Sequence, residues 1–275
     1  HDVNDKEGIR SNSIYSLLVD DRGAVWVGHF QAGLDYSLYQ NGLFRTYAYP
    51  PLFNSANLSI RSFVNRGQEK VIGSRDGLFY INEATGVVKS FVKPVLTSDL
   101  ILTISFYQGE YYIGTYGGGM MVLNPGTLSL KYFAQGDTEL FQKGHIFCVK
   151  PDAKGNLWIG TSQGLFCYNG QTKQIKHFTS ANSQLPEGNV YEVSFDSTGK
   201  GWIATETGMC IYDPASQNLR SNVFPEGFVH RDKVRTIYED AEHNLYFIRE
   251  KGSLFTSTLT MDRFQNRSIF STLPD

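Results

Sequence analysis

The sequence lacks a surplus of charge of either sign. Its 25 Lys and Arg residues stand against 27 Asp and Glu residues, the formal net charge is −2 at pH 7, and only 19% of the chain is charged. A protein that binds nucleic acid or an anionic membrane surface needs a basic surplus to neutralise phosphate groups. The composition therefore argues against nucleic acid and membrane surfaces as partners.

Long apolar runs and an initial methionine are also missing. No stretch approaches eighteen consecutive apolar residues, so the sequence predicts no transmembrane helix. Residue 1 is His, and the residues after it lack the charged and apolar regions of a signal peptide. We therefore expect a processed chain or a segment of a longer protein.

Cysteine is scarce. Cys148, Cys167 and Cys210 each lie within an apolar run, and no C-x-x-C spacing supports a metal or redox site. A free cysteine usually behaves as a small buried hydrophobic residue. We expect three buried free thiols, no metal site and no cofactor.

A repeated motif fills the rest of the chain. The run Val25-Trp26-Val27-Gly28 has five further copies, and the residue before each glycine or its substitute falls at positions 27, 72, 113, 159, 203 and 247. The steps between copies are 41 to 46 residues long. Self-similarity at this period is typical of repeat folds such as propellers.

The fourth unit shows how one repeat is expected to fold. Four β-prone runs, IFCVKPD, LWIGT, LFCYN and QIKHF, are separated by the turn sequences AKGN, SQG and GQTK. The two central runs are almost continuously apolar, which indicates a sheet buried on both faces. The sequence therefore predicts an all-β fold: a β-propeller of four-stranded antiparallel blades, with six repeats that close a ring or belong to a seven-bladed one.

We predict a single propeller domain over residues 1–275. The expected blades are 10–50, 58–92, 99–134, 144–179, 188–224 and 232–271. The second-strand aromatic residue is expected to fill the wedge between blades, and the glycine near the end of that strand lets neighbouring sheets converge.

Two turn sequences resemble ligand loops but are interpreted as turns. The Asp-rich turns between first and second strands are too short for an EF-type calcium loop, so turn formation explains their Asp residues. The glycines at 117–119 are followed by neither a helix nor the lysine of a phosphate-binding loop.

Function should lie where equivalent positions of the repeats differ. In a propeller, the loop between the second and third strands and the loop between consecutive blades surround the mouth of the central channel. We predict a ligand-binding face there, to which Thr161 and Ser162 also contribute, with Phe53, Phe141 and Phe228 at the tips of the longer loops. Its candidate binding residues are His29, Phe30, Arg75, Asp76, Tyr116, Gln163, Glu206, Arg249 and Lys251.

Catalysis at this face is the weaker hypothesis. Asp76 and Glu206 come from the second and fifth blades, which lie opposite one another in a six-bladed ring, so a paired-carboxylate or metal site has the right residue types. His29 is a further candidate for such a site. No motif marks a nucleophile and its base, and we therefore predict no catalytic residue. A propeller lyase or hydrolase and a protein-interaction scaffold remain the alternatives to a binding module.

The repeat resembles the two-component regulator propeller repeat. The pattern I-x-x-I/V-x-x-D-x-x-G-x-L-W-I-G-T-x-x-G-L-x-x-Y is fullest in "IYSLLVDDRGAVWVGHFQAGLDYSLYQNGLFRTY" and "IFCVKPDAKGNLWIGTSQGLFCYNGQTKQIKHF". The family occurs in the sensor regions of bacterial hybrid two-component systems, which typically carry two seven-bladed propellers, a β-sandwich, one membrane helix, and cytoplasmic kinase and regulator domains. The six repeats of this chain depart from that number.

The resemblance implies a periplasmic segment of an inner-membrane sensor. Its expected ligand is small and polar, often an oligosaccharide or another glycan-derived molecule, and its expected partners are the neighbouring domains of the same sensor and a second copy in a homodimer. Kinase motifs are missing from this sequence, so the resemblance implies the sensing part alone. Ligand binding would then shift a conformational equilibrium.

Overall fold

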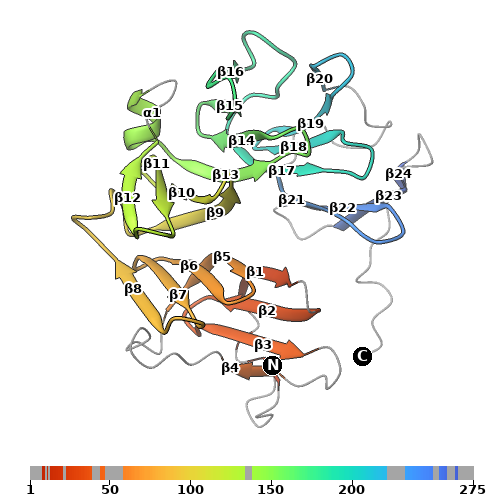
Figure 1. Ribbon diagram of the computed structural model, residues 1–275. Coiled ribbons are helices and arrows are strands. Elements are labelled where there is room, and N and C mark those ends of the chain that lie inside the picture. Colours follow the sequence, from red (N-terminus) through yellow and green to blue (C-terminus); the bar gives the residue numbers. More distant parts are fainter. Residues whose placement is uncertain are drawn as a thin grey trace. The chain divides into compact units, whose positions relative to one another are not determined.

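The computed structural model describes residues 8–9, 11, 13–20, 23–38, 44–46, 58–133, 138–221, 233–249, 254–258 and 264–265. Over these ranges the chain forms six antiparallel four-stranded sheets, and the strands of each sheet follow one another in chain order (Figure 1). The predicted all-β propeller with four-stranded blades is thereby confirmed. The chain divides into two compact units, His1–Ile146 and Phe147–Asp275.

The first unit holds three blades and one short helix. Blade 1 consists of β1 (Ile14–Val19), β2 (Ala24–His29), β3 (Leu34–Leu38) and β4 (Phe44–Thr46). Blade 2 consists of β5 (Ile60–Arg66), β6 (Glu69–Ser74), β7 (Leu78–Asn82) and β8 (Val87–Phe91). Blade 3 consists of β9 (Ile101–Tyr107), β10 (Glu110–Thr115), β11 (Met120–Asn124) and β12 (Ser129–Tyr132), and α1 (Thr138–Lys143) follows it.

The second unit holds the other three blades. Blade 4 consists of β13 (Ile146–Pro151), β14 (Asn156–Thr161), β15 (Gly164–Asn169) and β16 (Ile175–Phe178). Blade 5 consists of β17 (Val190–Phe195), β18 (Gly201–Thr205), β19 (Gly208–Asp213) and β20 (Asn218–Arg220). Blade 6 consists of β21 (Val234–Glu239), β22 (Asn244–Arg249), β23 (Leu254–Thr258) and β24 (Phe264–Gln265).

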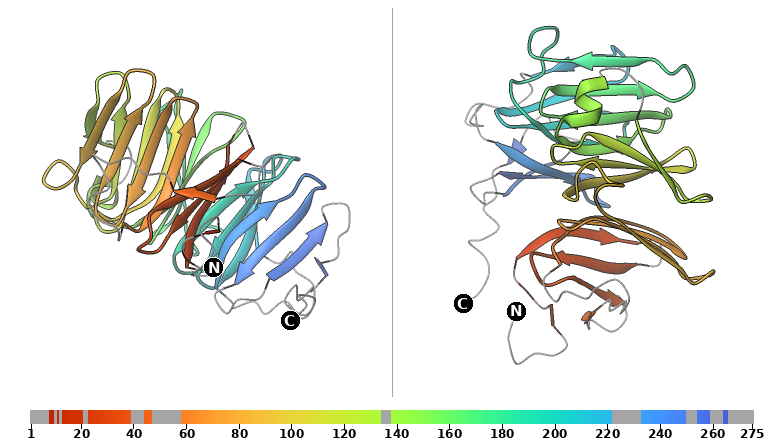
Figure 2. Two further views of the ribbon diagram at one scale, coloured as in Figure 1. Left: turned by 90° about the horizontal axis from the view of Figure 1, so that it is seen from below. Right: turned by 90° about the vertical axis from the view of Figure 1, so that its left-hand side faces the viewer.

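The strands of blade 4 lie where the sequence predicts them. Each begins and ends within a few residues of the four β-prone runs. The turn glycine Gly155 has a φ of 77°, a left-handed conformation that glycine adopts without a steric cost. In both views of Figure 2 the strands of a blade run side by side with the twist typical of antiparallel sheets.

The second-strand tryptophans fill the spaces between blades, as predicted. The ring of Trp26 in blade 1 lies 6.0 Å from that of Phe63 in blade 2, and Trp158 in blade 4 lies 5.9 Å from Phe195 in blade 5. Both tryptophans are buried. Burial of these large rings on both faces of the sheets forms the core between consecutive blades.

The glycines of the second strands allow the blades to approach closely. A Cβ atom built on Gly73 would lie 2.5 Å from Cγ2 of Ile101 in the next blade, and one on Gly160 would lie 2.7 Å from the carbonyl oxygen of Val190. Any larger residue would push the next sheet away. The predicted role of these glycines is therefore confirmed.

One predicted loop contains a helix. In the segment 134–145, α1 buries Leu140 and Phe141, and the ring of Phe141 meets that of Phe133 edge-on at 5.0 Å. The Gly144 N–H donates to the Leu140 carbonyl oxygen across 2.6 Å. Phe141 is therefore a core residue and not the exposed loop tip that we predicted, because one helical turn directs both apolar side chains inward.

Candidate ligand-binding site

The loop between the second and third strands begins with a buried side chain. In blades 2 to 5 this residue is a Ser or Thr that is 0% exposed, and its hydroxyl donates to the carbonyl oxygen of the glycine that opens the third strand. The four pairs are Ser74 with Gly77, Thr115 with Gly119, Thr161 with Gly164, and Thr205 with Gly208. This position belongs to the scaffold, so Thr161 is corrected from a recognition residue to a loop-closing one.

His29 occupies the same position in blade 1 and is also buried. Its Nε2 atom lies 2.9 Å from Oδ2 of Asp35, and the two side chains are 0% and 1% exposed. Asp35 stands where the other blades place an apolar residue: Phe79, Met121, Phe166 or Cys210. Because His29 does not reach solvent, it is a buried structural residue and not part of the exposed face that we predicted.

The loops of blades 1 and 2 meet at Ser59. Its hydroxyl oxygen accepts a hydrogen bond from the Gln31 N–H at 3.2 Å, and its carbonyl oxygen accepts one from the Arg75 N–H at 3.1 Å. The structure thus brings Phe30 and Arg75 to one segment between the blades. The side chains of Arg75 and Asp76 are exposed, and that of Phe30 is partly buried.

Tyr116 in blade 3 forms an exposed aromatic face. It is 51% exposed, and its ring lies 4.0 Å from that of His145 with the planes inclined by 35°. The Tyr116 N–H donates to the Leu100 carbonyl oxygen, and the Ser98 hydroxyl donates to the Tyr116 carbonyl oxygen, both across 2.9 Å. A ring held in this way is a suitable surface for a flat ligand.

In blade 4 the loop that carries Gln163 is fixed by a histidine. Nε2 of His177 lies 2.8 Å from the Gln163 carbonyl oxygen, and the imidazole stacks on the Phe166 ring at 3.9 Å. The Gln163 side chain is exposed. The loop is therefore ordered while its amide side chain faces solvent.

In blade 5, Glu206 contacts the segment that precedes β17. Its N–H donates to the Asn189 carbonyl oxygen across 2.9 Å, and its Oε2 accepts from the Asn189 N–H across 3.3 Å. Part of its hydrogen-bonding capacity is thus already used. The side chain of Arg249 and the whole of Lys251, Phe53 and Phe228 lie outside the described residues.

Sequence reasoning missed a set of side chains at β-bulges near the start of the first strands. The pairing of first and second strands skips one residue in blades 1, 2, 3, 5 and 6. The skipped residues are Tyr15, Arg61, Leu102, Tyr191 and Arg235. Bulges redirect side chains and are frequent beside functional sites. The available signal was the variable residue after the first apolar residue of each repeat, as in IYS, IRS and VYE.

In each unit, two of these bulge residues, a tyrosine and an arginine, contact each other. The Arg61 guanidinium carbon lies 4.7 Å from the centre of the Tyr15 ring, and that of Arg235 lies 4.5 Å from the centre of the Tyr191 ring. In each case the tyrosine comes from one blade and the arginine from the next. We call each of these two combinations a Tyr–Arg pair. The Tyr15 ring also meets Phe30 edge-on at 5.3 Å.

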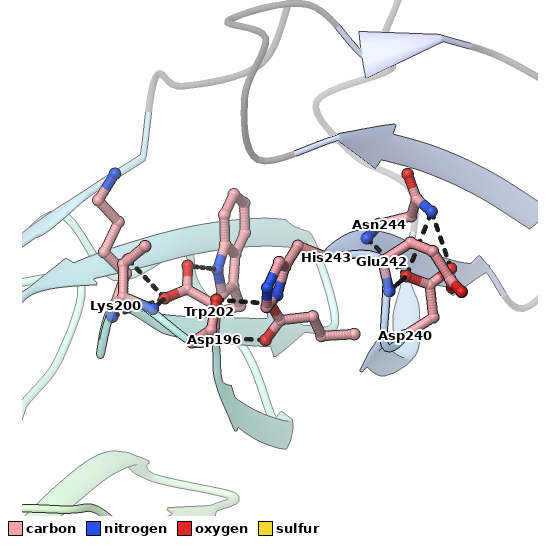
Figure 3. A network of polar contacts seen from close by, with 10 residues as sticks. Asp196, Lys200, Trp202, Asp240, Glu242, His243 and Asn244 are labelled. Atoms are coloured by element: carbon pink, nitrogen blue, oxygen red, sulfur yellow. Dashed lines mark hydrogen bonds and ion pairs between the residues drawn. The ribbon is translucent and has the colours of Figure 1, made fainter.

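At the other end of the second strand, an Asp organises the turn. In blade 5, Asp196 Oδ1 accepts from the backbone N–H groups of Thr198 and Lys200, and Oδ2 accepts from the indole N–H of Trp202 across 2.8 Å. Figure 3 shows this network beside the equivalent turn of Asp240 in blade 6. The same Asp–Trp contact recurs at 2.9 Å in blades 1 and 4.

The turn aspartates therefore have the predicted role, together with an indole contact that we did not predict. Across the described ranges, no group of three or more His, Cys, Asp or Glu side chains is placed to hold a metal ion.

The thiols lie in apolar surroundings. All three cysteines are free, Cys148 and Cys210 are buried, and Cys167 is partly buried. Burial raises the thiol pKa of both Cys148 and Cys167 to about 12 and also raises that of Cys210. The prediction of free thiols is confirmed, and that of full burial holds for two of the three.

Comparison with protein families and solved structures bears on the resemblance. The profile of the family described as two-component regulator propeller matches residues 8–31 and 141–163. None of the curated proteins compared with the chain matches its sequence. No helix in the described part of the chain has the length and apolar character needed to cross a membrane.

Several solved structures share the fold. The extracellular domain of BT3049, assigned as a hybrid two component system of B. thetaiotaomicron, matches with a TM-score of 0.73 and 24% identity over 98% of this chain and 36% of that one. The extracellular domain of BT4673 from the same organism matches with a TM-score of 0.62 and 18% identity over 91% of this chain and 38% of that one.

A third structure, YCF48 bound to D1 peptide, matches with a TM-score of 0.69 and 13% identity over 95% of this chain and 83% of that one. This chain thus spans little more than a third of the length of the two B. thetaiotaomicron domains. The predicted resemblance is confirmed in part of the chain: residues 8–31 and 141–163 match the two-component regulator propeller family, and the chain shares its fold with these extracellular domains.

Proposed function

We propose that this chain is a ligand-binding segment of the periplasmic sensor region of a hybrid two-component system, and that it acts by binding and not by catalysis. The two-component regulator propeller repeats and the fold shared with the extracellular domains of such systems support this proposal. Because those domains are much longer than this chain, the neighbouring domains of the same sensor are its proposed partners.

The observation that carries the proposal is the combination of fixed backbone and exposed side chains in the loops. Backbone hydrogen bonds tie the segments at Ser59, Leu100 and Asn189 to the loops that carry Arg75, Tyr116 and Glu206. Loops that are already ordered lose less conformational entropy on binding. Side chains that differ from blade to blade can therefore determine ligand specificity on a rigid frame.

The proposed ligand is a small polar molecule of the oligosaccharide class. In the first unit, the exposed ring of Tyr116 offers a face for the apolar side of a sugar ring, and Arg75 and Asp76 offer donors and acceptors for hydroxyl groups. Binding would stabilise one arrangement of the chain relative to its neighbouring domains and so bias the signalling equilibrium. A second copy in a homodimer of the full-length sensor is a further proposed partner.

A thermal-shift and calorimetric screen of the chain against oligosaccharides tests the proposal. A ligand at about 100 times its Kd adds about 2.7 kcal/mol to the free energy of unfolding, which is readily seen as a higher Tm. Tyr116→Ala should abolish the shift. Tyr132→Ala is the matched control, because Tyr132 is similarly exposed, at 49%, and lies in strand β12 and not in the loop between the second and third strands.

Two outcomes would contradict the proposal. Turnover of a saccharide by the purified chain would favour the propeller enzyme. Binding of peptides together with failure to bind any saccharide would favour a protein-interaction scaffold.

A further inference from the structure

Arg61 has hydrogen-bonding capacity that the described part of the chain does not use. It stands at the bulge of β5, partly buried, with its guanidinium over the Tyr15 ring. Its Nε atom is buried and has no hydrogen-bond partner among the described residues. Stacking on an aromatic face leaves the N–H donors of a guanidinium in its own plane, so the contact with Tyr15 does not satisfy them.

A second arginine lies at the same end of this hairpin. Ile60 pairs with Ser74 across β5 and β6, and the N–H of the next residue, Arg75, donates to the Ser59 carbonyl oxygen. Among the described residues, no carboxylate forms an ion pair with the guanidinium of Arg61 or Arg75. Both arginines thus lie close to Ser59 along the backbone, and within the described ranges neither has a carboxylate counter-charge.

Arg66, on the same strand, shows the contrasting arrangement. Its guanidinium carbon lies 3.4 Å from the centre of the Phe106 ring, and its Nη1 lies 3.5 Å from Oε2 of Glu69. Stacking on a ring is therefore common to both arginines, whereas the carboxylate partner is present only at Arg66.

The second unit repeats the arrangement. The Tyr191 ring is approached by the Arg235 guanidinium at 4.5 Å and by the Lys233 ammonium at 5.2 Å, and Phe147 meets it edge-on at 5.2 Å. A tyrosine ring that contacts a second aromatic ring and an arginine thus occurs at the bulges of both units, and the second unit adds Lys233. The repeat scaffold does not require this, because blade 3 carries Leu102 at the bulge.

We infer that the Tyr15–Arg61 pair, together with Arg75, binds the oxyanion of a ligand, either a carboxylate or a sulfate. This inference rests on the proposed binding function and adds the ligand's charge to it. A guanidinium fork matches a two-oxygen anion with two parallel hydrogen bonds. The rings of Tyr15 and Phe30 supply an apolar surface beside it, so the anion is carried by a molecule with a flat apolar face, such as an acidic sugar.

The test follows the Arg61 Nε–H signal by NMR in the ¹⁵N-labelled chain. The chain is titrated with D-glucuronate, with sodium sulfate and with D-glucose, and NaCl keeps the ionic strength constant. The signal, assigned by its loss in Arg61→Gln, should move saturably with glucuronate or sulfate and stay in place with glucose. A shift with glucuronate alone indicates a carboxylate site, and a shift with sulfate alone indicates a sulfate site.

Variants measure the contribution of the guanidinium. Arg61→Gln should weaken binding of the active anion about tenfold or more, in keeping with the loss of a charge-assisted hydrogen bond. Arg61→Lys keeps the charge without the fork and should recover only part of the affinity. Arg66→Gln should leave the affinity unchanged, and urea unfolding of each variant verifies that the fold is retained.

The inference is overturned if neither anion moves the Arg61 signal, if glucose moves it equally, or if Arg66→Gln weakens binding as much as Arg61→Gln. These results are separable from a failure of the proposed function. If an oligosaccharide binds through Tyr116 while neither glucuronate nor sulfate moves the Arg61 signal, the anion site is removed and the sensor proposal stays intact.

Discussion

Nζ of Lys150 lies 3.3 Å from Oε1 of Glu192, and this ion pair joins β13 of blade 4 to β17 of blade 5. The charge of Glu192 raises the Lys150 pKa, and burial opposes that rise. Burial raises the Glu192 pKa, and the charge and hydrogen bond of Lys150 oppose it. Lys150 therefore keeps the Glu192 pKa lower than burial alone would set it.

The pair predicts a pH-dependent stability for Lys150→Met. The pKa of a Glu carboxyl is about 4 in the unfolded chain. When the folded state raises this pKa, the free energy of unfolding falls as the pH rises from about 4 through the raised value. Removal of the lysine raises the Glu192 pKa further and enlarges this loss. We expect Lys150→Met to cost about 1 kcal/mol at pH 7 and almost nothing below pH 4, as measured by urea unfolding across that range.

The stability that the wild-type lysine adds through this pair is lost at high pH. Its raised pKa adds stability below its unfolded value of about 10.4, and this is lost as the pH rises through the folded value. Lys131→Met is the matched control, because Lys131 pairs with Glu110 at 3.1 Å within blade 3, whereas the Lys150 pair joins two blades. A cost for Lys150→Met that is equal at pH 4 and pH 7 would show that packing of the side chain, and not charge, is responsible.

The Asp–Trp contact of blade 5 predicts a large effect of Asp196→Ala. The substitution removes a buried carboxylate that accepts from the Trp202 indole and from two backbone N–H groups of the turn. We expect a loss of about 2–3 kcal/mol in the free energy of unfolding. Trp202→Phe, which removes only the indole N–H and part of the ring, should lose less.

The control for this turn is Asp213→Ala. Asp213 also accepts a backbone hydrogen bond in its turn, from the Ala215 N–H at 2.9 Å, but it contacts no indole. A loss for Asp213→Ala as large as that for Asp196→Ala would show that turn formation alone accounts for the effect.

The buried pair of blade 1 predicts strong coupling between His29 and Asp35. His29→Thr alone leaves the Asp35 carboxylate buried without the imidazole, and Asp35→Met alone leaves the imidazole without the carboxylate, so each should cost about 3 kcal/mol. The double substitution restores the residue types used in blade 3, where Thr115 bonds the Gly119 carbonyl oxygen beside Met121.

The double variant should therefore be at least about 1 kcal/mol more stable than the sum of the single losses predicts. Urea unfolding of the four proteins in the cycle measures this coupling. Additive losses would show that the two side chains contribute independently and that the pair is not a unit.

The blade architecture follows from local patterns in the sequence. Short β-prone runs, turn glycines and a repeat of 41 to 46 residues specify each four-stranded sheet, because every blade uses the same local interactions. Helix α1 was missed because only the burial of Leu140 and Phe141 reveals it, and a six-residue helix carries little periodic signal.

The candidate site was only partly predictable for a physical reason. Loop residues were chosen because they differ among repeats, yet the difference at His29 reflects a buried pair with Asp35 and not exposure to a ligand. Conversely, Arg61 and Tyr191 stand within strands and were not among the predicted binding residues. The one-residue bulge that redirects them depends on the pairing register of two strands, which single-strand patterns do not report.

The raised pKa values of the cysteine thiols predict low reactivity in the folded chain. With a pKa of about 12, roughly one Cys148 or Cys167 thiol in 10,000 is ionised at pH 8, and the thiolate is the reactive form. The folded chain should therefore react very slowly with a disulfide reagent such as Ellman's reagent, and all three thiols should react at once in 6 M urea. Cys167 is less buried than Cys148, so it is the thiol that the reagent reaches most easily. Cys167→Ser removes this thiol and leaves the two buried ones. If most of the slow reaction persists in this variant, local opening around Cys148 or Cys210 limits the rate; fast reaction of the folded wild-type chain would contradict the raised pKa values.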